Sequence, residues 1–125
     1  MKKIVSTTKA PAAIGPYSQA VQAGGLVITS GQLPIDPATG AFPEGVGAQT
    51  RQSLTNVKAV LEGASTGMDH IIKTTVFLKD MNDFGAMNEV YATFFTEGGF
   101  PARSAIEVAR LPKDALVEIE AVAVL

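Results

Sequence analysis

Residues 100–124 read FPARSAIEVARLPKDALVEIEAVAV, and the arrangement expected for the rest of the chain depends on them. Two runs within it, 102–108 and 116–124, alternate between two kinds of side chain, as β-strands do when successive residues point to opposite faces. Each run carries charged residues on one face beside apolar residues. The chain is therefore predicted to end in two β-strands joined by a short connection that contains a proline.

The charged residues of these two runs suggest a site for a small anion. Arg103 shares its face of the first run with Ala105 and Glu107, and Glu118 and Glu120 share one face of the second. A guanidinium can hold a carboxylate through two parallel hydrogen bonds, which an ammonium cannot do. If Arg103 and Glu118 share a sheet face, the pair predicts a small-carboxylate site. The alternative is structural, because charged strand residues are often solvated or protect an exposed edge.

The N-terminal third of the chain supplies further strands. Residues 2–6, 18–23 and 26–30 are predicted strands. Two consecutive glycines join the last two, and they predict a two-residue hairpin because both positions can adopt positive φ. Residues 32–45 are rich in turn formers and predict a surface loop.

The middle of the chain predicts a helix followed by an inner strand. From about residue 46 to 63, apolar residues recur at steps of three and four, which indicates an amphipathic helix that Gly63 and Gly67 bring to an end. Residues 71–78 are apolar and rich in β-branched residues, as expected of an inner strand. The helix stripe consists of Leu54, Val57, Leu61 and Ala64.

A second helix is predicted after this strand. Asn82 or Asp83 is expected to cap it, and Gly98-Gly99 to stop it. Its helical spacing is interpreted as packing against the sheet rather than as a cofactor site. The stripe consists of Phe84, Met87, Tyr91, Phe94 and Phe95.

The order of these elements predicts a single α+β domain over residues 1–125. Two helices cannot cover both faces of a mixed sheet of five to six strands, so both are expected on one face. The other face, expected to carry Arg103, Glu118 and Val122, then needs another cover, and a second copy of the chain is the natural supplier.

Composition limits the classes of function. Hydrophobic residues make up 46% of the 125 residues and charged residues 18%, so a compact domain with some surface covered by other subunits is expected. The net charge of −2, without a basic cluster, argues against nucleic-acid binding. Cysteine is absent, His70 has no partner at ligand spacing, and Lys58 is interpreted as solvated, so neither a metal nor a cofactor is expected. No signal peptide or membrane span is recognised, so a cytoplasmic protein without a membrane partner is expected.

Five separated segments, in order, resemble the RidA family, also called the YjgF family. They are APAAIGPYSQA (10–20), ITSGQLP (28–34), RQSLTNVKAVLE (51–62), KTTVFLKDMNDF (73–84) and the C-terminal tail. The resemblance implies a chorismate-mutase-like sandwich that assembles as a homotrimer, with the sheets lining a central barrel and three clefts between subunits. It also implies that the last strand is central and that the strand of Arg103 is not its neighbour. The sequence alone would allow a simple hairpin.

The resemblance further implies an activity and the residues that carry it. Members of the family hydrolyse reactive enamines and imines left by pyridoxal-phosphate dehydratases, such as 2-aminoacrylate/2-iminopropanoate and 2-iminobutanoate, to 2-oxo acids and ammonia. Arg103 would hold the substrate carboxylate, Glu118 would activate water as an acid–base group, and Glu120 would be structural. The remaining residues expected to line the cleft are Tyr17, Ser30, Gly31, Asn88, Ser104 and Ala105.

One position departs from the family pattern. Many relatives carry Cys where this chain has Ala105, so a contribution there would come from the backbone carbonyl, and catalysis cannot depend on a thiol. Two other functions stay open. The clefts could bind a small carboxylic acid as a sensor without turnover, or the protein could cleave RNA, which its acidic composition disfavours.

Overall fold

The computed structural model describes all 125 residues and consists of a six-stranded sheet with two α-helices. Helix α1 (Val46–Gly63) connects β3 to β4, and α2 (Phe84–Ala92) connects β4 to β5. The predicted α+β class is confirmed. The strands are β1 (Lys3–Val5), β2 (Ala20–Ala23), β3 (Leu26–Thr29), β4 (Ile71–Leu78), β5 (Ala102–Glu107) and β6 (Val117–Val124); short 3₁₀ turns lie at Met68–His70, Met81–Asp83 and Pro112–Asp114.

The strand order is β1-β2-β3-β6-β4-β5. All neighbours are antiparallel except β4 and β5, which run parallel because α2 returns the chain to the same end of the sheet. The last strand is therefore central, and β4 separates it from β5 at the edge. This confirms the order implied by the family resemblance and excludes a β5–β6 hairpin.

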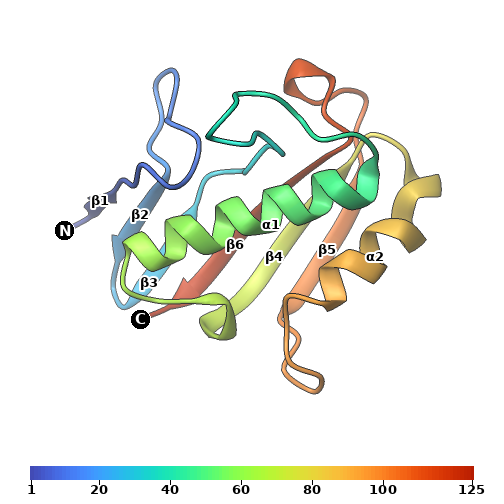
Figure 1. The fold of residues 1–125 in the computed structure, drawn as a ribbon. Helices are drawn as coiled ribbons and strands as arrows, with labels where there is room; N and C mark the ends of the chain where they lie inside the picture. The colour runs from blue at the N-terminus through green and yellow to red at the C-terminus, as the bar shows by residue number, and fades with distance from the viewer.

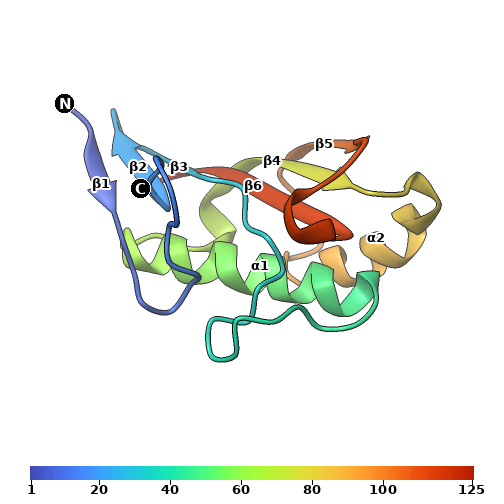
Figure 2. The same cartoon turned by 90° about the horizontal axis from the view of Figure 1, so that it is seen from above.

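Both helices lie on one face of the sheet, as predicted (Figures 1 and 2). The core between them and the sheet is one cluster of 18 buried residues. From β6 it receives Val117, Ile119, Ala121 and Ala123. The predicted stripe also lies in it, with Leu54, Val57 and Leu61 from α1 and Ala64 directly after the helix, together with Val60 of α1. The other face of the sheet carries no helix and is called the open face below. No helix of the protein is long and apolar enough to cross a membrane.

Local chemistry accounts for several element ends. Gly24 and Gly25 both have positive φ, 57° and 80°, which matches the twist that a two-residue hairpin needs between β2 and β3. The C-terminal end of α1 differs from the prediction. Gly63 is the last helical residue, and the positive φ that follows falls on Ser65, at 63°, instead of on a glycine.

The start of α2 also differs from the prediction. Asp83 occupies the N-cap position, but its side chain caps nothing. The Asp80 carboxylate accepts the Asn82 N–H at 2.9 Å instead, because a 3₁₀ turn precedes the helix and takes over its first hydrogen bonds. Phe94 and Phe95 lie beyond the end of α2, although both pack against the core.

The strands next to the hairpin are shorter than predicted, and the loop after β3 is less exposed. β2 begins at Ala20 and β3 ends at Thr29, where the chain leaves regular pairing. Val122 faces Ile28, yet Ile119 faces Gln32, so one extra residue is accommodated in between, as in a β-bulge. Gln32, expected in a surface loop, is consequently buried against β6.

The prediction that Arg103 and Glu118 share a sheet face is wrong. Arg103 lies opposite Thr74 of β4, and Glu118 lies opposite Phe77 of the same strand. Paired residues point to the same face, and residues three apart in one strand point to opposite faces. Arg103 therefore lies on the helix-covered face and Glu118 on the open face. Which residues of β5 and β6 share a face depends on how each strand pairs with β4, and neither sequence run shows this pairing.

Candidate active site

Glu118 lines a cavity of about 530 Å³ at the end of the sheet where β6 begins. Loops contribute most of the wall, and several of its residues are apolar. Tyr17, Ser30 and Gly31, all expected at the site, line it together with Glu118. The remaining wall residues are Pro11, Ala12, Ile14, Gln19, Gln32, Leu33, Ile35, Pro112 and Lys113.

The bulge after β3 gives Glu118 its place. Gly31 lies directly against the Glu118 side chain, and a Cβ on Gly31 would lie 2.8 Å from the carboxyl carbon, closer than real Cβ atoms come. The Gly31 N–H makes no hydrogen bond within the chain. A glycine is therefore needed here so that the carboxylate fits, and a backbone donor is left beside it.

The environment of Glu118 favours its neutral form. The side chain is half-buried, and this desolvation raises its pKa above the usual glutamate value. The negative charge of Glu120, on the same face of β6, raises the pKa further. A carboxyl group with a raised pKa is a stronger base when ionised, which suits it to take up a proton during catalysis and to release it again.

The loop between β1 and β2 brings Tyr17 to the cavity. Gln19 anchors the loop, since its side-chain amide donates to Thr7 O at 3.1 Å and Pro11 O at 2.8 Å, and its oxygen accepts the Thr7 N–H at 2.7 Å. Tyr17 is 51% exposed, and its hydroxyl has no partner in the chain. The Ser30 hydroxyl donates to Ser18 O at 2.6 Å. The Tyr17 hydroxyl is thus a free side-chain donor in this wall, in addition to the Gly31 N–H.

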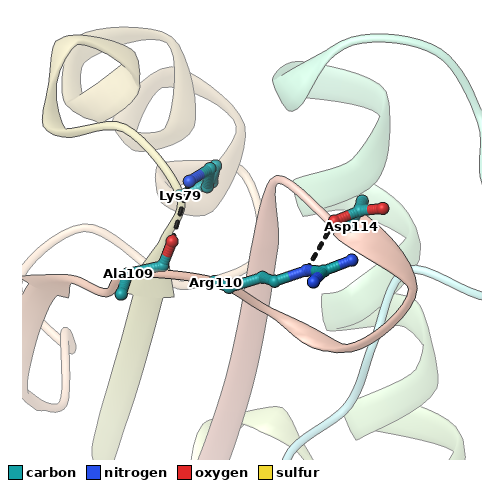
Figure 3. Close-up of polar contacts among 4 residues, drawn as sticks. All are labelled: Lys79, Ala109, Arg110 and Asp114. Atoms are coloured by element: carbon teal, nitrogen blue, oxygen red, sulfur yellow. Dashed lines mark hydrogen bonds and ion pairs between the residues drawn. The ribbon is translucent and has the colours of Figure 1, made fainter.

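The connection between β5 and β6 brings Lys113 to the rim of the cavity. Two contacts hold this loop (Figure 3): Lys79 Nζ donates to Ala109 O at 2.8 Å, and Arg110 Nε lies 3.0 Å from Asp114 Oδ1. Lys113 and Asp114 both have a φ of 56°, which is uncommon for residues other than glycine. Lys113 therefore adds a positive charge to the rim from a loop of defined shape.

Arg103 lies on edge strand β5, packed against α2. Its Nη1 donates to Asn88 Oδ1 at 2.7 Å. Its guanidinium carbon lies 4.8 Å from the ring centroid of Tyr91 and 5.4 Å from that of Phe84, within the range of cation–π attraction. Asn88, expected at the site, is thus brought to Arg103.

The neighbours of Arg103 in β5 point in different directions. Ala105 shares the helix-covered face and packs against the core. Ser104 lies on the open face, where its hydroxyl accepts a hydrogen bond from Lys73 Nζ at 3.2 Å. Side-chain contacts of Ser104 and of Arg103 are therefore made on opposite sides of the sheet.

The expected site residues form two groups within one chain. Tyr17, Ser30, Gly31 and Glu118 line the cavity. Arg103 and Asn88 lie across the sheet, with β4 between β5 and β6. One small molecule cannot touch both groups of the same chain, because the sheet separates them.

Sequence reasoning missed several residues of both groups. Helical spacing predicts only a core role for Phe84 and Tyr91, although their side chains also flank Arg103. Gln19 anchors the Tyr17 loop, and Lys113 reaches the cavity rim. Gln19 could have been identified from the sequence, because it lies in the GPYSQ motif. The contacts of Phe84 and Tyr91 with Arg103 could not, because they depend on the strand register that places Arg103 beside α2.

The fold and the site define a class of small α+β proteins with several solved members. The crystal structure of the YjgF gene product from E. coli matches with a TM-score of 0.94 and 58% identity, covering 98% of each chain. The structure of E. coli TdcF with bound serine matches with a TM-score of 0.94 and 52% identity, again covering 98% of each chain.

Sequence comparison assigns the family within that class. The family described as Endoribonuclease L-PSP matches residues 7–125. The 2-iminobutanoate/2-iminopropanoate deaminase of Salmonella typhimurium is 60% identical over 126 residues, which cover 99% of this chain and 98% of that protein. The chain belongs to the Endoribonuclease L-PSP family, which is the RidA (YjgF) family, and the resemblance seen in its motifs is confirmed.

Proposed function

We propose that the protein hydrolyses the imines 2-iminobutanoate and 2-iminopropanoate to 2-oxo acids and ammonia. The observation that carries this proposal is the half-buried Glu118, seated against Gly31 in a cavity, with a pKa raised by burial. The near-full-length identity to the Salmonella typhimurium deaminase supports the same reaction. E. coli TdcF, which binds serine, supports a ligand with a carboxylate beside a nitrogen.

Arg103 holds the substrate carboxylate in this proposal. Asn88 occupies one edge of the guanidinium, and the other N–H groups are free to bind two carboxylate oxygens side by side. Fixing the carboxylate orients the C=N carbon that is attached to it. Positioning of this kind is a large part of catalysis when two reactants must meet.

Glu118 handles the protons of the reaction. The ionised carboxylate accepts a proton from water as the water oxygen bonds to the C=N carbon, and the nitrogen gains a proton to give a carbinolamine. The Glu118 carboxylate next takes the hydroxyl proton of the carbinolamine and delivers it to the nitrogen, so the carbon–nitrogen bond breaks, ammonia leaves, and a C=O bond forms. The raised pKa of Glu118 suits both directions of proton transfer. Glu120 is assigned a structural and electrostatic role.

The complete site requires two copies of the chain. The helix-covered edge of one chain, with Arg103, would face the cavity of another, with Glu118. The open face supports assembly because large apolar side chains are exposed there, including Ile28 at 53% and Ile106 at 44%. We propose a homotrimer with sites between subunits. Protection of pyridoxal-phosphate enzymes and a cytoplasmic location belong to the same proposal.

Three substitutions separate an enzyme from a binding module. Imines are generated in situ, and their decay to 2-oxo acid is followed together with binding of 2-oxobutanoate. Arg103→Ala should weaken both about ten- to hundred-fold, because a charge-assisted pair is lost. Glu118→Ala should lower turnover by about two to four orders of magnitude while binding survives.

Glu120→Ala is the matched control, since it removes the neighbouring carboxylate on the same face. It should keep most of the activity if assembly is intact. An active Glu118→Ala beside an inactive Glu120→Ala would reverse the two assignments. A wild-type protein that binds 2-oxobutanoate but never accelerates imine decay would be a sensor.

A further inference from the structure

We propose that Tyr91 is a positioning residue for Arg103. Its ring forms, with Phe84, an aromatic cradle that holds the guanidinium ready for a substrate carboxylate. This rests on the proposed function in one respect, that Arg103 receives the carboxylate. Tyr91 also belongs to the hydrophobic core, and its contact with Arg103 is additional to that packing role.

The two rings of the cradle and the Asn88 amide all contact the guanidinium. The ring centroids of Tyr91 and Phe84 lie 4.8 Å and 5.4 Å from the guanidinium carbon, and Asn88 Oδ1 accepts a hydrogen bond of 2.7 Å from Nη1. No carboxylate in the chain forms a salt bridge with Arg103. The positive charge is thus held by rings and an amide, and its preferred partner, a carboxylate, is left for a ligand.

The Tyr91 side chain is itself held in place by the sheet beneath α2. It is only 4% exposed, and its hydroxyl forms a 2.7 Å hydrogen bond with the buried hydroxyl of Thr74. Thr74 lies opposite Arg103 in the β4–β5 register, so the three residues form one row across the sheet and α2. On its other side the ring packs on Phe95, with centroids 4.9 Å apart. A ring held at its hydroxyl and at its side has little freedom to move.

A fixed ring reduces the conformational entropy that the Arg103 side chain loses when a ligand binds. An arginine side chain has many rotamers, and a ligand that binds a mobile arginine must also order it. An arginine already held in one orientation loses less freedom when the carboxylate arrives, so binding is tighter without any new contact to the ligand. The ring of Tyr91 therefore acts on affinity through Arg103.

The test compares two substitutions that both remove the Tyr91 hydroxyl. Tyr91→Phe keeps the ring, whereas Tyr91→Leu keeps an apolar side chain without a ring. Both leave the Thr74 hydroxyl without this partner, so both should lower Tm. Tyr91→Leu should raise the Kd for 2-oxobutanoate about five- to thirty-fold, the effect of losing one well-packed cation–π contact, and Tyr91→Phe should stay within about threefold of wild type.

A role in positioning also predicts which kinetic constant changes. With imine as substrate, Tyr91→Leu should raise KM about as much as Kd and leave kcat nearly unchanged, because the interaction is uniform along the reaction. If Tyr91→Leu does not fold, Phe84→Leu replaces it, since Phe84 is 36% exposed and its loss disturbs the core less. It should raise Kd in the same direction.

Equal Kd values for the ring-keeping and ring-removing variants would overturn the inference and leave Tyr91 as a core residue. The Kd measurement needs no turnover, so it is independent of the deaminase reaction. If wild type binds 2-oxobutanoate but does not accelerate imine decay, the proposed function fails and the cradle is still judged by Kd. If wild type does not bind 2-oxobutanoate at all, the cradle fails too.

Discussion

Gly31→Ala tests whether the position of Glu118, rather than its mere presence, supports turnover. The added Cβ would lie 2.8 Å from Cδ and 3.1 Å from Cγ of Glu118. Carbon atoms in contact normally lie about 3.5–4.0 Å apart, so the carboxyl group must retreat by roughly 1 Å. A misplacement of about 1 Å can lower a rate about a hundredfold. We therefore expect turnover to fall by about two orders of magnitude.

The same substitution should hardly change the stability of the fold. Gly31 is not among the glycines with positive φ, so alanine fits its backbone without strain. Replacing glycine by alanine stabilises by about 0.4–1 kcal/mol through the unfolded chain. Moving the flexible end of Glu118 off its rotamer costs about 0.5–1.5 kcal/mol. The free energy of unfolding should thus change by less than about 1 kcal/mol.

The assay measures imine decay, 2-oxobutanoate binding and urea unfolding of the same preparation. Gly47→Ala is the matched control, because it adds a methyl group in α1 at an ordinary 3.6 Å from Val90 Cγ2, away from the cavity. It should keep full turnover. A Gly31→Ala protein that is as active as wild type would refute the reasoning, since it would show that turnover does not depend on the position of the Glu118 carboxylate against Gly31.

Three further predictions concern charge, assembly and nucleic acid. The raised pKa of Glu118 means that the native protein binds its proton more tightly than the unfolded chain, so this contribution to stability is full below the usual glutamate pKa and is lost as pH rises through the raised pKa. Glu118→Gln should consequently be more stable than wild type in urea at neutral pH, at equal protomer concentration, with the difference vanishing in acid. Ile106→Asp on the open face should give monomers by light scattering at micromolar concentration, because burying an unpaired charge costs several kcal/mol, whereas Ala48→Asp on exposed α1 should not. Single-stranded RNA should stay intact with purified protein at moderate salt, and cleavage that vanishes with Arg103→Ala would contradict this.

The helices and the inner strand were predictable because their patterns are local. The apolar stripe of α1 and the β-branched run of β4 each specify their own element, and both agree with the structure in type and bounds. The hairpin at Gly24-Gly25 follows from backbone freedom at two neighbouring residues. The caps were less predictable, since Asp80, Asn82 and Asp83 can all accept the same kind of hydrogen bond.

The relation between Arg103 and Glu118 could not be read from either run. Each run shows which of its own residues share a face, but the face itself is set by pairing with β4, a strand more than twenty residues away. The bulge after β3 is likewise a long-range feature, because it shows only where Gln32 meets Ile119. For the same reason the cradle around Arg103 escaped prediction: helical spacing already explained Tyr91 as a core residue.

The separation of the two residue groups has a consequence for how the protein should behave in dilute solution. Arg103 of one chain and Glu118 of another would have to meet for a single ligand to contact both, so ligand binding and assembly would share one equilibrium. A ligand that binds only the assembled form stabilises it by mass action, and a weaker assembly raises the apparent Kd in return. Specific activity should then fall on dilution below the assembly constant, and 2-oxobutanoate should move the midpoint of assembly, followed by light scattering, to lower protein concentration. If the activity per chain stays constant from assembled protein to proven monomer, one chain is sufficient for catalysis. That result would contradict the proposed shared site, because the sheet prevents one ligand from contacting Arg103 and Glu118 of the same chain.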